Sequence, residues 1–172
     1  GDTLEDSHAG TATSTKTWEE MKAVELLPFE AGIAAGADVV MAAHITTPNA
    51  TEDGLPASLS YTMLTERLRG ELGFTGVICT DGLGMKAITD HYSPAEAAIA
   101  ALDAGADLLL LPADLQEAFD GVVAAVESGR ISEERLDESV RRILTLKEKA
   151  GLSLRASTPA DTLLDRLSRL WN

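Results

Sequence analysis

The chain has 172 residues, of which 45% are hydrophobic and 24% are charged, as in one ordinary globular domain with a sizeable core. Lys and Arg number 14 against 28 Asp and Glu, and the net charge of -14 argues against partners such as nucleic acid or an anionic membrane surface. No apolar run is long enough to cross a bilayer, so we expect no membrane insertion, and the single cysteine, Cys79, excludes an intramolecular disulfide.

The first sixteen residues are polar, rich in Thr, Ser, Asp and Gly, and have no hydrophobic period. This composition predicts a loop without regular structure over residues 1–16. The chain opens on Gly1 rather than on Met, and we expect this start to lie inside the loop. We therefore expect an N-terminally truncated piece of a longer protein.

The first helical segment begins at Thr17, which has the spacing of a capping box with Glu20. The pattern is mostly helical up to Gly36, a C-terminal cap signal, with Pro28 as a possible interruption. The apolar run over residues 39–45 then predicts a buried strand.

The second unit carries the clearest functional signal. After a loop over residues 46–56, apolar residues at helical spacing predict a helix from about Ser60 to Gly73. A short β-favouring run over residues 76–80 follows and is typical of a strand buried on both faces. The run ends in Asp81, and chemistry in parallel α/β folds gathers at the carboxyl ends of strands. Asp81 is therefore a candidate reactive group, the alternative being that it only caps the next turn.

The third unit opens at Ser93, where an N-cap Ser, a Pro and a Glu start an Ala-rich helix that closes at Gly105. A strand is expected over residues 107–111. Two further helices follow, one capped by Asp114 and one starting at Ser132. The last of them presents an apolar face made of Leu136, Val140, Ile143 and Leu144.

Strands that alternate with helices of this length predict parallel pairing and right-handed crossovers. A (β/α)8 barrel needs eight strands and typically about 250 residues, whereas this chain offers about three strands. Two architectures are open: a small open sheet with helices, or the C-terminal portion of a TIM-type barrel with its N-terminal strands missing. The loop at the start favours the barrel, with residues 1–150 as its partial domain and 151–172 as a tail with a possible short helix.

Further candidate reactive groups include Asp6 and His8 in the opening loop. A His beside an acid in a polar loop is a plausible proton-transfer pair, although a solvated loop with a local turn hydrogen bond is the alternative. For His44, at the end of the first strand, a hydrogen bond at the barrel mouth is favoured over chemistry. For His91 a structural role before the Ser93 cap is favoured.

Two stretches of the sequence together resemble glycoside hydrolase family 3. Residues 76–86 (GVICTDGLGMK) are similar to its nucleophile segment, and residues 1–8 (GDTLEDSH) are similar to a loop of its β-N-acetylglucosaminidase branch. In that branch the loop follows a Lys-His-Phe-Pro-Gly-His-Gly-Asp-Thr segment, of which Gly1-Asp2-Thr3 is present here. The resemblance covers roughly residues 1–150 and implies the C-terminal part of a catalytic barrel.

The resemblance implies a retaining glycosidase in which Asp81 is the nucleophile, His8 the general acid/base and Asp6 the partner that orients His8. Met85 and His44 would be substrate-binding residues. The expected substrate is a carbohydrate, with terminal GlcNAc in chitooligosaccharides or cell-wall muropeptides, and no cofactor or metal is expected. The compartment stays open between the bacterial cytoplasm and the cell envelope or exterior.

Three alternatives remain at this point. The sugar-binding residues that precede this loop in the family are absent here, so the chain alone could be inactive without its missing N-terminal part. A metal-dependent barrel hydrolase would use Asp6, His8, His44 and Asp81 as ligands, though their spacing matches no ligand motif. A β-glucosidase or β-xylosidase of the same family is disfavoured, because those members lack the Asp-Ser-His loop.

Overall fold

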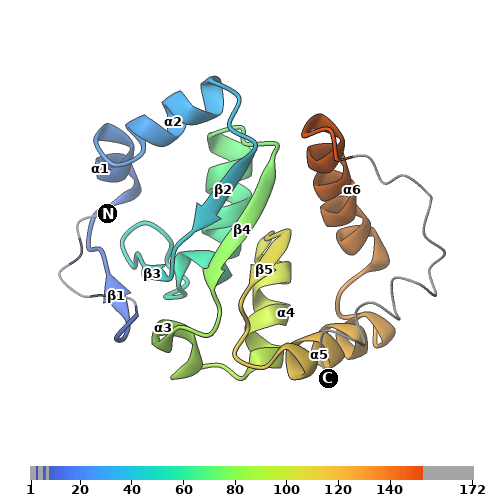
Figure 1. Ribbon diagram of the computed structural model, residues 1–172. Helices are drawn as coiled ribbons and strands as arrows, with labels where there is room; N and C mark the ends of the chain where they lie inside the picture. The colour runs from blue at the N-terminus through green and yellow to red at the C-terminus, as the bar shows by residue number, and fades with distance from the viewer. Residues whose placement is uncertain (1–2, 4–5, 7, 153–172) are drawn as a thin grey trace.

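The computed structural model of this chain describes residues 3, 6 and 8–152, and the predicted tail helix lies outside them. Its centre is a parallel sheet in the order β2–β4–β5 (Figure 1). These strands are β2 (Val39–Ala42), β4 (Val77–Gly82) and β5 (Leu108–Leu110). A second parallel pair joins β1 (Ala12–Thr13) to β3 (Ile45–Thr46). The predicted parallel pairing is confirmed.

Helices occupy connections between the strands, and two more, α5 and α6, follow the last strand, β5. They are α1 (Trp18–Ala23), α2 (Leu27–Ala34), the 3-10 helix η1 (Ala57–Leu59), the π-helix η2 (Thr62–Glu71), α3 (Lys86–Thr89), α4 (Pro94–Ala104), α5 (Leu115–Glu127) and α6 (Glu133–Lys149). The predicted caps form: Thr17 and Ser93 make complete capping boxes, and Asp114 and Ser132 accept hydrogen bonds from the first turns of their helices. In the described part of the chain, no helix is long and apolar enough to cross a membrane.

The core lies on one face of the sheet. Ile78 of β4 is fully buried there, in one cluster with Leu64 of η2 and Ala101 of α4. Helix α5 then packs on α4 so closely that a Cβ on Gly121 would lie 2.5 Å from the Cβ of Ala95. Small residues at these positions therefore set the spacing of the two helices.

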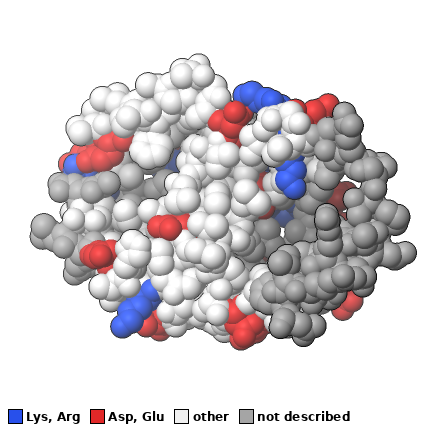
Figure 2. All heavy atoms as spheres, viewed as in Figure 1, with Lys and Arg blue, Asp and Glu red and all other residues white. Residues whose placement is uncertain are grey.

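The opposite face of the sheet is open, which corrects the expectation of a buried strand over residues 39–45. Met41, Cys79 and Leu108 are partners in register across the three strands, so they share this face. Met41 is 54% exposed and Leu108 is 38% exposed, whereas Cys79 on the central strand is buried. Figure 2, viewed as in Figure 1, shows few charged side chains over the middle of the molecule. Of the three strands of this sheet, only β4 is buried on both faces as predicted.

Three further expectations need correction. The opening stretch is not wholly irregular, because Ala12–Thr13 pair with β3 as strand β1. The helix after residue 60 has π-helical rather than α-helical hydrogen bonding. In α6, Val140 and Leu144 are exposed, while Ser139 is buried against Asp107. Leu136 and Ile143 are half-buried, and Leu136 packs against a core cluster, so the apolar stripe of α6 is covered only in part.

Candidate active site

Asp81 is the penultimate residue of β4, at the carboxyl end of the sheet, as predicted. A β-bulge lies beside it: Cys79 pairs with Leu108 but Gly82 pairs with Leu110, so β4 contains one extra residue there. The hydroxyl of Thr80 accepts the Leu110 N–H at 3.1 Å and so satisfies a donor of the interrupted ladder. Bulges re-aim side chains near active sites, and here the re-aimed residue is half-buried Asp81.

The turn after Asp81 is held by backbone hydrogen bonds. The Gly82 N–H donates to Asp81 Oδ1 at 2.8 Å, and the Met85 N–H donates to the Gly82 carbonyl at 3.0 Å. The Gly84 N–H donates to the carbonyl of Leu111, a residue with φ of 44°. A leucine in this left-handed region is strained, and such strain persists where the surrounding structure enforces it. Half-buried Met85 thus ends a hydrogen-bonded turn that begins one residue after Asp81.

His44 is fully buried and uses both ring nitrogens. Its Nε2 lies 2.9 Å from the Gly82 carbonyl, which can only accept, so Nε2 carries the proton. The Ser58 hydroxyl then donates to Nδ1 at 2.6 Å. Burial lowers the pKa of His44, against the opposing effects of the Gly82 carbonyl and the Asp81 charge. Of the two roles predicted for His44, the structure supports the hydrogen bond at the barrel mouth; a substrate contact stays a prediction.

Asp6 and His8 form the predicted pair. His8 Nδ1 lies 2.7 Å from Asp6 Oδ1, and the His8 backbone N–H donates to the same oxygen at 2.9 Å. The hydrogen bonds from the His8 backbone and ring lower the pKa of Asp6, so its carboxylate is ionised at neutral pH. An ionised carboxylate accepts from Nδ1–H, which leaves Nε2 to exchange a proton. Both side chains are exposed, and among the described residues no hydrogen bond or ion pair joins His8 to Asp81.

Several residues that sequence reasoning missed support these groups. Ser58 and Thr80 are buried hydroxyls that hold His44 and the bulge. Thr11, at the end of the Asp6–His8 loop, lies 3.2 Å from Nε2 of His91. Single hydroxyl residues occur everywhere in a sequence, and no spacing marks these ones.

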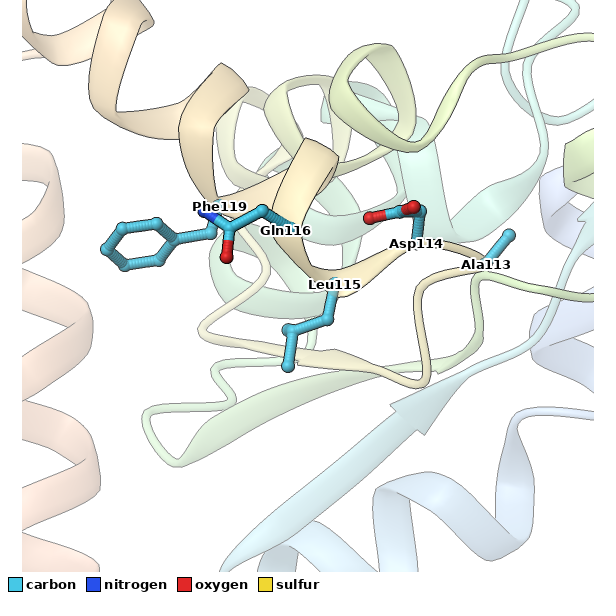
Figure 3. Close-up of a pocket in the computed structure, with 5 residues that line it drawn as sticks. All are labelled: Ala113, Asp114, Leu115, Gln116 and Phe119. Carbon is cyan, nitrogen blue, oxygen red and sulfur yellow. The ribbon is translucent and has the colours of Figure 1, made fainter. Parts of the chain in front are cut away.

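A cavity of about 650 Å³ opens elsewhere, at the start of α5 (Figure 3). It is lined by Ala113, Asp114, Leu115, Gln116 and Phe119, and by none of the predicted site residues. The Asp114 carboxylate is occupied as the cap of α5, accepting the Glu117 N–H at 2.9 Å. In Figure 3 the Phe119 ring points away from Asp114. The cavity thus offers no pair of reactive groups, and we place the site at Asp81.

The fold and the site together define an α/β protein of the TIM-barrel type, with a carboxylate at the carboxyl end of a central strand. Residues 1–146 match the Glycosyl hydrolase family 3 N terminal domain, and the chain belongs to this family. The β-hexosaminidase of Stenotrophomonas maltophilia strain R551-3 is 42% identical over 124 residues, which are 71% of this chain and 36% of that protein. The chain thus spans about a third of this relative.

Comparison with solved structures agrees with the comparison of sequences. A glycoside hydrolase family 3 β-N-acetylglucosaminidase from Paenibacillus sp. str. FPU-7 has 45% identity and a TM-score of 0.86, over 92% of this chain and 31% of that one. The β-glucoside phosphorylase BglX has 32% identity and a TM-score of 0.84, over 92% of this chain and 30% of that one. Similarity thus extends to a protein named as a β-glucoside phosphorylase.

Proposed function

We propose that this chain carries the reactive groups of a retaining β-N-acetylhexosaminidase that hydrolyses terminal β-GlcNAc bonds. The observation that carries the proposal is the Asp6–His8 pair, joined at 2.7 Å on a loop of a chain whose Asp81 ends the central strand. The β-N-acetylglucosaminidase and β-hexosaminidase names of similar proteins support the choice of sugar.

The reaction would proceed in two steps. In the first, the Asp81 carboxylate attacks the anomeric carbon while protonated His8 gives its Nε2 proton to the leaving oxygen. In the second, neutral His8 takes a proton from water, whose oxygen attacks the anomeric carbon and releases Asp81. Asp6 would hold the His8 tautomer and stabilise the imidazolium, as the acid of a catalytic triad does for its histidine.

Binding would need more than this chain. We propose that Met85 contacts the substrate beside Asp81, and that His44 acts through the Gly82 carbonyl that it holds. The partner of the chain would be the remaining part of the barrel, because the aligned residues make up only 36% and 31% of two similar proteins. The experiments therefore need the complete barrel, which we define as this chain together with the part of the barrel that it lacks. The natural substrates would be GlcNAc-containing glycans or muropeptides.

Substrate assays with His8 and Asp6 variants test the proposal. Nitrophenyl β-N-acetylglucosaminide should be hydrolysed much faster than nitrophenyl β-glucoside. His8→Ala should lower turnover about a hundred- to ten-thousand-fold, the usual cost of losing a general acid/base. Asp6→Asn should fall between the wild type and His8→Ala, because the imidazole remains but loses its charged partner. Full activity of His8→Ala would overturn the proposed mechanism.

Three controls separate the alternatives. Faster turnover of the β-glucoside would favour the β-glucosidase reading, and a requirement for phosphate would favour phosphorolysis, as in the name of BglX. Loss of wild-type activity on chelation would favour the metal-dependent hydrolase. Among the described residues, no three His, Cys, Asp or Glu side chains come together as metal ligands.

A further inference from the structure

One side-chain hydrogen bond joins the loop of Asp6 and His8 to the segment that follows Asp81. Thr11 Oγ1 lies 3.2 Å from His91 Nε2, although the two residues are 80 positions apart in the sequence. Thr11 stands between the turn that holds His8 and strand β1. His91 comes just after α3, the short helix that follows the Gly82–Met85 turn.

The loop is well held on both sides of Thr11. On one side, the Asp6 carbonyl accepts the N–H groups of Ala9 at 2.9 Å and Gly10 at 3.2 Å, which closes the turn that contains His8. On the other side, Ala12 is buried and pairs with β3. The turn is thus joined to β1 through Thr11, so the position of Thr11 influences where His8 lies.

The His91 side of the hydrogen bond is also fixed. The His91 N–H donates at 2.9 Å to the carbonyl of Ile88, a fully buried residue of α3. Between Thr11 and α3 lies a cavity of about 310 Å³, lined in part by Thr46, Ala87 and His91. Close packing is therefore incomplete between the loop end and α3, and the Thr11–His91 hydrogen bond crosses this space.

We propose that His91 is a positioning residue, which through Thr11 sets the place of the Asp6–His8 pair relative to Asp81. This inference rests on the proposed function. A general acid/base has to lie within hydrogen-bond reach of the proton it transfers, and a misplacement of about 1 Å can cost on the order of a hundredfold in rate. Loss of the hydrogen bond therefore lowers the acid/base contribution of His8 and leaves substrate binding nearly unchanged.

The test compares Thr11→Val with Thr11→Ser in the complete barrel. Valine has the shape of threonine without the hydroxyl, and serine keeps the hydroxyl. Thr11→Val should lower kcat about ten- to a hundredfold with little change in KM, and Thr11→Ser should restore most of it. The loss should be larger for a chitooligosaccharide than for the nitrophenyl glycoside, whose good leaving group needs little protonation.

A double-mutant cycle with His8→Ala distinguishes positioning from a purely structural role. Once His8 is absent, Thr11→Val should cause no further loss, and His91→Leu should behave in the same way. Two results would overturn the inference. One is a loss of kcat from Thr11→Val that is equal with and without His8. The other is wild-type activity of both Thr11→Val and His91→Leu when His8→Ala is impaired. Wild-type activity of His8→Ala would instead overturn the proposed function itself. If Thr11→Val does not fold, His91→Gln against His91→Leu makes the same comparison.

Discussion

His44 influences the reactive edge of the sheet without reaching solvent. Its ring links Ser58 in η1 to the Gly82 carbonyl, one residue after Asp81. Burial makes the charged form of this imidazole unfavourable, so the ring is held neutral with its proton on Nε2. Protonation would place a second hydrogen on Nδ1, and the Ser58 hydroxyl, which now donates to it, would have to turn and accept instead.

The lowered pKa of His44 predicts an acid-sensitive fold. Below the unfolded-state pKa of about 6.5 the unfolded chain binds a proton that the native ring resists, so stability falls as the pH drops toward the lowered native pKa. Above about 6.5 both states are neutral and the contribution is constant. Denaturation of the complete barrel from pH 7.5 down to about pH 5 measures this loss, which His44→Gln should reduce.

Ser58→Ala is the matched control, because it removes the hydroxyl and keeps the titrating ring. It should retain an acid-dependent loss of stability. If the stability of the wild type and that of His44→Gln fall in parallel over this pH range, the assignment of a buried neutral His44 ring is wrong.

Some features of single residues could be predicted from the sequence and others could not. The strand-end position of Asp81 and the hydrogen bond between Asp6 and His8 were predictable, because an acid that ends an apolar run and a His beside an acid are visible patterns, while their catalytic roles stay predictions. The bulge at Thr80 was not, since it depends on the register between β4 and β5. The strained Leu111 was not either, since leucine gives no sign of a positive φ.

At the scale of elements, the same tripeptide has two different roles. Gly-Ala-Asp precedes β2 at residues 36–38 and β5 at residues 105–107. Asp38 is exposed and pairs with Lys149, whereas the Asp107 carboxylate is fully buried. The local pattern predicted the turn into each strand correctly, but the partners of each acid come from distant elements and had no local signal.

Asp107 joins several elements through one carboxylate. It accepts the Ile78 N–H at 2.9 Å and an Arg69 N–H at 2.6 Å, which ties β4 and η2 to the start of β5. From α6, the Ser139 hydroxyl donates at 2.7 Å and Arg142 at 3.1 Å. Burial lowers the pKa of the Arg69 guanidinium, and the Asp107 charge opposes this shift.

Removing this carboxylate should destabilise the fold strongly. Asp107→Ala leaves partly buried guanidinium groups facing one another without a counter-charge, which typically costs about 3–5 kcal/mol. Chemical denaturation of the complete barrel measures the change. The exposed pair of Asp103 and Arg130, 3.5 Å apart, gives the control, and Asp103→Ala should cost at most about 1 kcal/mol. Similar small losses for both variants would show that α6 is not held through Asp107.

At the scale of the whole molecule, the open face of the sheet is the main departure from an ordinary globular domain. Val39 and Met41 are 44% and 54% exposed on β2, and Figure 2 shows few charged side chains over the middle of the molecule. Apolar residues on a sheet face normally pack against another layer. The sequence predicted these strands as buried because their composition matches that of a barrel interior.

A charge on this face should have opposite effects in two contexts. In the chain alone, Met41→Lys should reduce binding of an apolar dye and aggregation, since it interrupts an exposed apolar patch. In the complete barrel the same substitution should destabilise the fold, because it buries an unpaired charge. Val24→Lys, at a 62% exposed position just after α1, is the control and should have little effect in either context. If Met41→Lys is tolerated equally in the chain alone and in the complete barrel, the claim that the complete barrel covers this face of the sheet is wrong.

The central claim is that Asp81 becomes covalently linked to the sugar while His8 moves the protons. Mass spectrometry of the His8→Ala complete barrel, quenched during turnover of a nitrophenyl β-N-acetylglucosaminide, tests it most directly. The first step should survive better than the second, because nitrophenolate leaves without protonation whereas water still needs a base. We predict one N-acetylglucosaminyl adduct on the peptide that contains Asp81. An adduct on another residue, or an unmodified protein that turns over at the wild-type rate, would contradict the account.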